Sequence, residues 1–133
     1  MKHTAVAVQT EQLSDTSPVI SVVEDNSVFT NLATTLAEIR KLKGVTGYIL
    51  RSNEAAIIDI TQKEFTIQYA ILSSQVAESA MSIANKFNLT NIESTLLEGK
   101  SVKVLCMSIG DNKLSIFMEK PCDDIWIVKR ILL

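Results

Sequence analysis

Residues Asn31 to Asp59 read NLATTLAEIRKLKGVTGYILRSNEAAIID, and this stretch decides the fold. Its first part is typical of an amphipathic helix, because apolar side chains recur every three or four residues on one face. These side chains are Leu32, Leu36, Ile39 and Leu42. Cations crowd the last turn (Arg40, Lys41 and Lys43), where they suit the negative end of the helix dipole. Gly44 follows and is placed to take the left-handed conformation that ends a helix.

Two short strands are predicted directly after this helix. Val45 to Arg51 and Glu54 to Ile60 are rich in β-branched and other apolar residues, and Ser52-Asn53 separates them. Asn53 can adopt the left-handed conformation that a tight hairpin turn needs. The stretch therefore predicts a helix followed by an antiparallel hairpin.

Composition places the chain among globular proteins of one domain. It has 133 residues, of which 47% are hydrophobic and 21% charged. The mean hydropathy of +0.21 is high for so small a domain, which predicts that a partner subunit covers surplus apolar surface. No run approaches the ~18 apolar residues of a membrane-spanning helix.

Charge and cysteine usage point to the cytoplasm. The net charge is −2 and no basic stripe is visible, so a nucleic-acid partner is not expected. The first residues, MKHTAVAVQTEQ, lack the apolar core of a secretory signal. Cys106 and Cys122 fit reduced thiols better than a disulfide framework. We expect a cytoplasmic protein without membrane insertion.

The first 26 residues differ in composition from the rest of the chain. They are rich in Thr, Ser, Gln and Glu and contain Pro18. We predict a flexible N-terminal arm over residues 1–26, in which the β-prone run Val19 to Val23 could dock as a strand. Residues 27–133 would form the domain, with Asn26 or Ser27 capping its first helix.

The longest periodic segment, Lys63 to Phe87, predicts a second helix with two apolar stripes. The first stripe, the predicted core face, consists of Phe65, Tyr69, Leu72, Val76, Ala80, Ile83 and Phe87. The second stripe consists of Ile67, Ile71, Ser74, Glu78 and Met81. It fits either a wide core face or an interface with a second body.

The C-terminal half predicts a meander of three strands, Asn91 to Leu97, Ser101 to Ile109 and Lys113 to Glu119. Asp123 could then cap a short helix from Asp124 to about Leu132. Ile125, Val128, Ile131 and Leu132 would turn its apolar side to the sheet.

This order of elements resembles the roadblock/dynein light chain family over about Val28 to Leu132. The most specific feature is the junction Lys43-Gly44-Val45 with the small residue Gly47 after it; an Asp-Gly turn, frequent in the family, is missing from the first hairpin. The resemblance implies an α/β (α+β) roadblock/profilin-like sandwich. Its central five-stranded antiparallel sheet would be flanked by helices in the order α-β-β-α-β-β-β-(short α).

The resemblance also implies a function, that of a non-enzymatic homodimeric scaffold. Such a protein binds a small Ras-like GTPase, a related roadblock protein or a larger motor or signalling assembly. In the family, the third strand pairs with its copy and the second helix packs beside its copy. Carried over to this chain, that places the dimer interface at Ile67, Ile71, Ser74, Glu78, Met81, Ile92, Ser94 and Leu96.

Catalytic, cofactor and metal sites are not expected. His3 is the only histidine and lies in the predicted arm, which disfavours a triad or a histidine base. Cys106 reads as a core residue and Cys122 as a bystander thiol, without Cys-x-x-Cys spacing. Gly99-Lys100-Ser101 ends like a P-loop, but Ser94 stands where the first glycine belongs.

One alternative function remains open, that of a ligand-sensing PAS-like module. Such a module holds a small molecule between sheet and helix and needs convergent polar groups there. The predicted sheet-facing residues Ile49, Val104, Leu114 and Ile116 provide none. A full apolar core is therefore the expectation.

Overall fold

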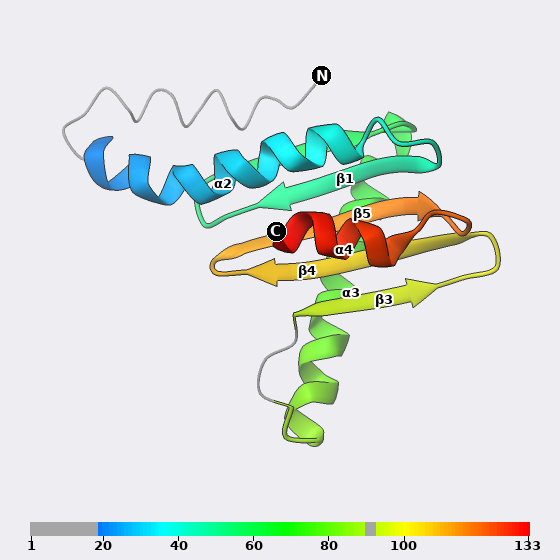
Figure 1. Cartoon of the computed structure of the whole chain (residues 1–133). Coiled ribbons are helices and arrows are strands. Elements are labelled where there is room, and N and C mark those ends of the chain that lie inside the picture. Colours follow the sequence, from blue (N-terminus) through cyan, green and yellow to red (C-terminus); the bar gives the residue numbers. More distant parts are fainter. Residues whose placement is uncertain (1–18, 90–92) are drawn as a thin grey trace.

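The computed structural model describes residues 19–89 and 93–133, with side chains from residue 27 onward. One antiparallel sheet forms its centre, with the strand order β2-β1-β5-β4-β3 (Figure 1). The strands are β1 (Val45–Arg51), β2 (Ala56–Ile60), β3 (Ser94–Glu98), β4 (Val102–Ile109) and β5 (Asn112–Glu119). The predicted five-stranded sheet is confirmed.

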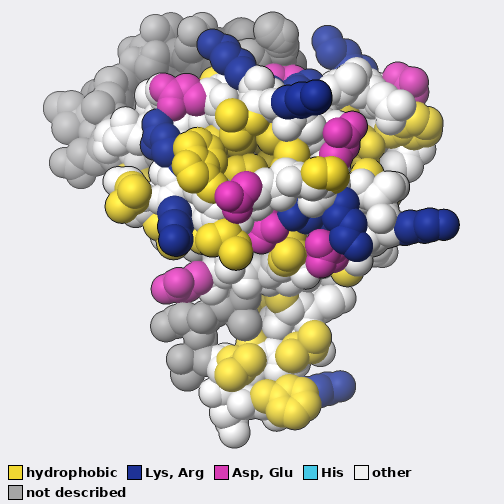
Figure 2. Space-filling view, turned by 45° about the vertical axis from the view of Figure 1, so that its right-hand side comes forward, with side chains coloured by type: hydrophobic (Ala, Val, Ile, Leu, Met, Phe, Trp, Pro, Cys, Tyr) yellow, Lys and Arg dark blue, Asp and Glu magenta, His cyan; other side chains and the backbone are white. Residues whose placement is uncertain are grey.

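Helices cover both faces of this sheet. Helices α2 (Val19–Ile39) and α4 (Asp124–Leu132) lie on one face, and α3 (Thr66–Lys86), which follows the short helix η1 (Lys63–Phe65), crosses the other (Figure 1). Hydrophobic side chains gather on the surface of the α2/α4 side and at the protruding end of α3 (Figure 2). Within the described ranges, no helix is both long and apolar enough to cross a membrane.

The larger core cluster lies between the sheet and the α2/α4 pair. Side chains of α2 and α4 meet alternate residues of the central strands there. Its buried members are Leu32, Leu36, Ile39, Val45, Tyr48, Leu50, Leu105, Met107, Leu114, Ile116, Met118, Ile127 and Ile131. The smaller cluster under α3 consists of Ile49, Ile60, Val76, Val104, Cys106 and Phe117. Cys106 is thus a core residue, as predicted.

The start of α2 corrects the prediction for the N-terminal segment. Residues 1–18 lie outside the described residues, but α2 begins at Val19, inside the predicted arm. The strand predicted over Val19 to Val23 and the caps at Asn26 or Ser27 are therefore wrong. β-Branched residues cost only tenths of a kcal/mol in a helix, and extending a helix is far easier than nucleating one.

The junction after α2 depends on two glycines. The α-helix ends at Ile39, and hydrogen-bonded turns continue the chain to Gly44, whose φ of +91° confirms the predicted left-handed conformation. Gly47 in β1 is required for close approach, because a Cβ there would lie 2.8 Å from the carbonyl oxygen of Asp59. A larger residue would be strained by the positive φ at position 44 and would clash with β2 at position 47.

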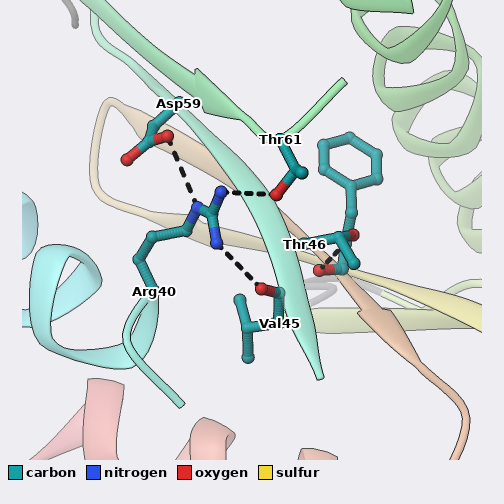
Figure 3. Close-up of polar contacts among 6 residues, drawn as sticks. Arg40, Val45, Thr46, Asp59 and Thr61 are labelled. Atoms are coloured by element: carbon teal, nitrogen blue, oxygen red, sulfur yellow. Dashed lines mark hydrogen bonds and ion pairs between the residues drawn. The ribbon is translucent and has the colours of Figure 1, made fainter. Parts of the chain in front are cut away.

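Arg40 fastens the end of α2 to the first hairpin (Figure 3). Its guanidinium donates to the Val45 carbonyl at 2.9 Å, to the Thr61 hydroxyl at 2.6 Å and to the Asp59 carboxylate at 3.4 Å. These contacts join α2 to β1 and to the end of β2. The α-helix ends one residue before Arg40 and has no basic residue in its last turn, so the predicted placement of the three cations in that turn is wrong. Arg40 still lies at the negative end of the helix dipole, and it also fixes the hairpin.

The first hairpin turns differently from the prediction. Its loop runs from Ser52 to Ala55, and the Ser52 hydroxyl accepts hydrogen bonds from the amides of Glu54 and Ala55. Asn53 does not have a positive φ. A serine side chain therefore organises this loop in place of a left-handed asparagine, and β2 begins at Ala56, later than predicted.

Helix α4 has the predicted bounds and cap, but the side that it turns to the sheet differs from the predicted side. The Asp123 carboxylate accepts from the Trp126 amide at 3.0 Å. Ile127 and Ile131 face the core, whereas Ile125 and Leu132, both predicted to face the sheet, are exposed. Apolar residues occupy both sides of this helix, so periodicity alone could not choose between them.

Candidate interaction interface

Strand β3 forms one edge of the sheet and is poorly covered. It pairs with β4 on one side, and in the described part of the chain no strand pairs with its other side. Leu96 and Leu97 point to opposite faces of the sheet, and both are exposed. The opposite edge strand, β2, is better covered. Strand β3 is therefore the more exposed of the two edge strands, with its outer backbone groups unpaired by the described strands.

Helix α3 exposes the second stripe that the sequence predicts. Ile67, Ile71 and Met81 are exposed, with Met81 at 58% of its maximal area. Ser73, Val76 and Ala84 are buried on the other side of the helix. At about 100° per residue, the centre of the second stripe lies roughly 130° around the helix from the centre of these buried residues. The stripe is therefore turned away from the core face of α3, and its apolar side chains remain exposed.

The end of α3 extends past the edge of the sheet (Figure 1). Ile83 and Phe87, predicted as core, are exposed, and Phe87 retains 70% of its maximal area. Phe65, at the other end of the predicted core stripe, is exposed as well. The prediction failed for Ile83 and Phe87 because a helical stripe shows which side of a helix is apolar, but not where the sheet beneath it ends.

A groove of about 580 Å³ runs between the second stripe and the sheet. Ser74, Ala77, Glu78 and Met81 form its helical wall, and Thr95, Cys106 and Ser115 lie on its floor. One side of the groove therefore leads to β3, the open edge. The helix stripe, the groove and the edge strand form one continuous surface, which we call the α3–β3 surface.

The floor of the groove is polar. The Ser73 and Ser115 hydroxyls are hydrogen-bonded to each other, and the Cys106 thiol lies 3.2 Å from the Ser115 hydroxyl. Burial raises the pKa of the Cys106 thiol, and the hydrogen bond with Ser115 opposes this shift. The expectation of an apolar core without polar groups is therefore wrong for this face. Ser115 lies on the same face as Phe117, so strand alternation could have placed it there.

Two cations lie side by side at the inner end of the groove. Arg51 of β1 is directly opposite Lys113 of β5, and both line the groove. Like charges in cross-strand register repel each other. In the described residues neither forms an ion pair. This end of the groove therefore favours a negatively charged or negatively polarised group.

Seven of the eight predicted interface residues lie on two elements of the described structure. Ile67, Ile71, Ser74, Glu78 and Met81 lie together on one side of α3. Ser94 and Leu96 lie in β3, but their pairing with Met107 and Leu105 puts them on the α2/α4 face. Ile92 lies outside the described residues. On the α3 face, β3 presents Thr95 and Leu97, which lie in the predicted third strand but not among the residues named for the interface.

The described residues bring together few groups that could perform chemistry. They contain no cluster of three or more His, Cys, Asp or Glu side chains that could hold a metal ion. Cys106 and Cys122 are free thiols, and His3 lies outside the described range. Burial raises the pKa of the Cys122 thiol, which donates a hydrogen bond to the Lys43 carbonyl. A raised pKa lowers the thiolate fraction and hence the reactivity of this cysteine.

An antiparallel sheet with helices on both faces and one open edge defines a small α/β interaction domain. The family model of the Roadblock/LC7 domain matches residues 32–114. This chain belongs to the Roadblock/LC7 domain family, whose members are generally non-enzymatic scaffolds for protein–protein interaction.

The structural comparison agrees with this assignment. The crystal structure of a Roadblock/LC7 domain from Streptomyces avermitilis superimposes with a TM-score of 0.59 at 12% sequence identity. The match covers 70% of this chain and 81% of that one. At this identity the likeness concerns the fold alone. No curated protein sequence matches the chain.

Proposed function

We propose that this chain is a non-enzymatic, cytoplasmic homodimeric scaffold that tethers or regulates a small Ras-like GTPase or a larger motor or signalling assembly. The observation that carries the proposal is the α3–β3 surface. An open edge strand, an exposed helical stripe and a groove between them are continuous there. A second copy of the chain presents the same three features and is complementary to them under two-fold symmetry.

Antiparallel pairing of β3 with its copy would extend the sheet and lay α3 beside its copy. The protruding end of each helix, with Ile83 and Phe87, would then lie over the partner's sheet. The C-terminal end of the incoming helix is the negative end of its dipole, and it would point toward Arg51 and Lys113. An interface of about 800 Å² per partner, typical of stable complexes, is within reach of these elements.

Family membership supports the partner class but not the identity of the partner. A related roadblock protein could replace the second copy, because its edge strand would offer the same backbone groups. The net charge of −2 supports a protein partner over a nucleic acid. The non-enzymatic part of the proposal follows the family, whose members are generally non-enzymatic.

Light scattering coupled to size exclusion, over a dilution series, tests the dimer. We expect a mass near twice 14.7 kDa that persists on dilution. Met81→Arg should shift the mass toward the monomer, because it places an unpaired charge in the helix contact. Ser79→Arg is the matched control, since Ser79 is exposed on the other side of α3. A monomeric wild-type chain, or an unchanged mass for Met81→Arg, would contradict the dimer.

Affinity purification of the tagged chain from its native cells tests the GTPase. We expect a small GTPase among the retained proteins, detected by its bound guanine nucleotide. The comparison between wild type and Met81→Arg shows whether retention requires the dimer. Absence of any GTPase from the wild-type sample would rule out this partner class and leave the dimer untouched.

The polar groove floor also favours the second candidate function, a PAS-like ligand-sensing module. A pocket of this size with several hydroxyls suits a small polar molecule. The two functions compete for one space, because a second α3 would fill the groove. A monomer that is thermally stabilised by a small molecule would favour sensing. A dimer without such stabilisation would favour the scaffold.

A further inference from the structure

Helix α4 has an apolar outer face that the fold leaves uncovered. Ile127 and Ile131 pack on the sheet, yet Ile125 and Trp126 on the outer side retain 64% and 48% of their maximal areas. A short helix that is apolar on two sides is expected to be covered on both. Because α3 lies on the other face of the sheet, the α3–β3 dimer would leave this outer face free.

A concave site adjoins this face, where the end of α2 meets the start of α4. Its volume is about 360 Å³. It is lined by Leu42, Lys43, Pro121, Cys122, Asp123, Trp126 and Ile127, and we call it the α2–α4 groove. Figure 2 shows hydrophobic side chains gathered on this part of the surface, with charged side chains around them. The groove has room for a large apolar side chain between Leu42 and Trp126.

Some charged side chains around the α2–α4 groove are held in ion pairs, and others are not. Lys43 lines the groove, and Lys129 lies one turn beyond Trp126 on α4; in the described part of the chain neither forms an ion pair. Of the nearby acids, Asp124 pairs with Lys103 at 2.6 Å, whereas Asp123 caps α4 and keeps its negative charge in the groove lining.

Glu119 lies near Cys122 and, like Asp123, is not held in an ion pair by the described residues. Three exposed lysines without an ion pair, Lys43, Lys129 and Lys41 after the end of α2, compare with these two carboxylates. The balance of unpaired charge around the α2–α4 groove is therefore positive by one.

We propose that the α2–α4 groove binds an acidic amphipathic segment of a partner protein. One large apolar side chain of that segment inserts between Leu42 and Trp126, and its carboxylates pair with Lys43 and Lys129. The combination of an aromatic anchor site and a charged rim is typical of protein–protein hot spots. The inference rests on the proposed scaffold function, to which it assigns a partner surface on the face away from the dimer.

Trp126 is the only tryptophan of the chain, so its fluorescence reports on this groove alone. The probe is a synthetic helical peptide with leucines on one face and glutamates elsewhere, titrated into the full chain. We expect a saturable blue shift of Trp126 emission and protection from acrylamide quenching. Lys43→Glu should weaken binding about tenfold, because it reverses a charge beside the anchor.

Two matched controls make the result specific. A peptide with lysines in place of the glutamates should not bind, and Lys86→Glu, the same charge reversal at the far end of α3, should bind like wild type. No change in emission with the acidic peptide, or an equal change with the basic one, would overturn the proposal. So would a concentration-dependent blue shift without peptide, because a second copy would then occupy the groove.

Failure of this proposal is distinguishable from failure of the scaffold function. The oligomeric mass reports on the α3–β3 surface, and Trp126 emission reports on the α2–α4 groove. A dimer that does not bind the acidic peptide overturns only the assignment of the α2–α4 groove. A monomer that binds the peptide overturns the dimer and leaves the groove assignment standing.

Discussion

The two faces of the sheet differ in how completely apolar side chains cover them. On the α2/α4 face, thirteen buried residues form one cluster of apolar side chains. On the α3 face, six buried residues form the cluster, and a groove with a polar floor lies beside it. The first face accounts for most of the apolar burial, which is the main favourable contribution to folding. The second carries the surface that we propose as the dimer interface, so stability and the proposed association would depend on different faces.

The sharpest test of this separation removes core volume from each face in turn. Leu36→Ala, in α2 at a fully buried site, should destabilise the chain by about 2–5 kcal/mol. Val76→Ala, the corresponding change in α3, should cost about 1.5 kcal/mol, since it deletes two methyl groups at about 0.8 kcal/mol each. Urea unfolding at one fixed protein concentration measures both, because a dimer makes stability concentration-dependent. Equal losses would contradict the division of roles.

The next largest loss of stability is expected from a substitution of Arg40, which follows α2 on the α2/α4 face. Arg40→Met removes three hydrogen bonds that join α2 to the hairpin and should cost about 1.5–3 kcal/mol. Arg130→Met is the control, because it breaks only the exposed pair with Glu38 and should cost less than about 1 kcal/mol. The same unfolding experiment compares them. A similar loss for both would mean that Arg40 is an ordinary surface cation.

Much of the fold was predictable because its signals are local. The spacing of Leu32, Leu36 and Ile39 gives the core face of α2, and Gly44 marks the end of the junction. The three strands of the C-terminal meander were predicted to within about three residues at each end. Alternation and turn residues suffice for such elements. The start of α2 at Val19 was missed, since propensity alone does not show how far a helix extends.

The candidate interface was only partly predictable, because it depends on where elements stop and which faces they share. The second stripe of α3 could be read from periodicity, but the exposure of Phe87 follows from the width of the sheet. Strand order, which puts β3 at an edge and Arg51 beside Lys113, is a tertiary property. The sequence prediction therefore found the helix of this surface and missed the groove beside it.

A smaller effect is expected from the polar floor of the groove. Ser115→Ala alone should cost about 1 kcal/mol, since it leaves the buried Ser73 hydroxyl without its partner. Ser73→Ala together with Ser115→Ala should cost less than the sum of the single changes, with a coupling of about 0.5–1.5 kcal/mol. A double-mutant cycle by urea unfolding measures this coupling. Strict additivity would show that the two hydroxyls do not act as a pair.

The smallest effect concerns alkaline pH and again compares the two faces. Burial raises the pKa of the Tyr48 hydroxyl on the α2/α4 face; nearby Asp59 adds to this shift and Arg40 opposes it. Burial also raises the pKa of the Cys106 thiol on the α3 face. In each case the unfolded chain releases its proton at a lower pH than the folded chain, so stability falls as pH rises through this window.

The loss of stability should begin near pH 9, the ordinary pKa of the thiol, and continue past pH 10, that of the tyrosine. Unfolding free energies measured from pH 7 to pH 11 test this. Cys106→Ala should flatten the first part of the decline and Tyr48→Phe the second, because each variant removes one titrating group. If neither variant changes the slope, the alkaline loss has another origin and the two buried groups do not control it.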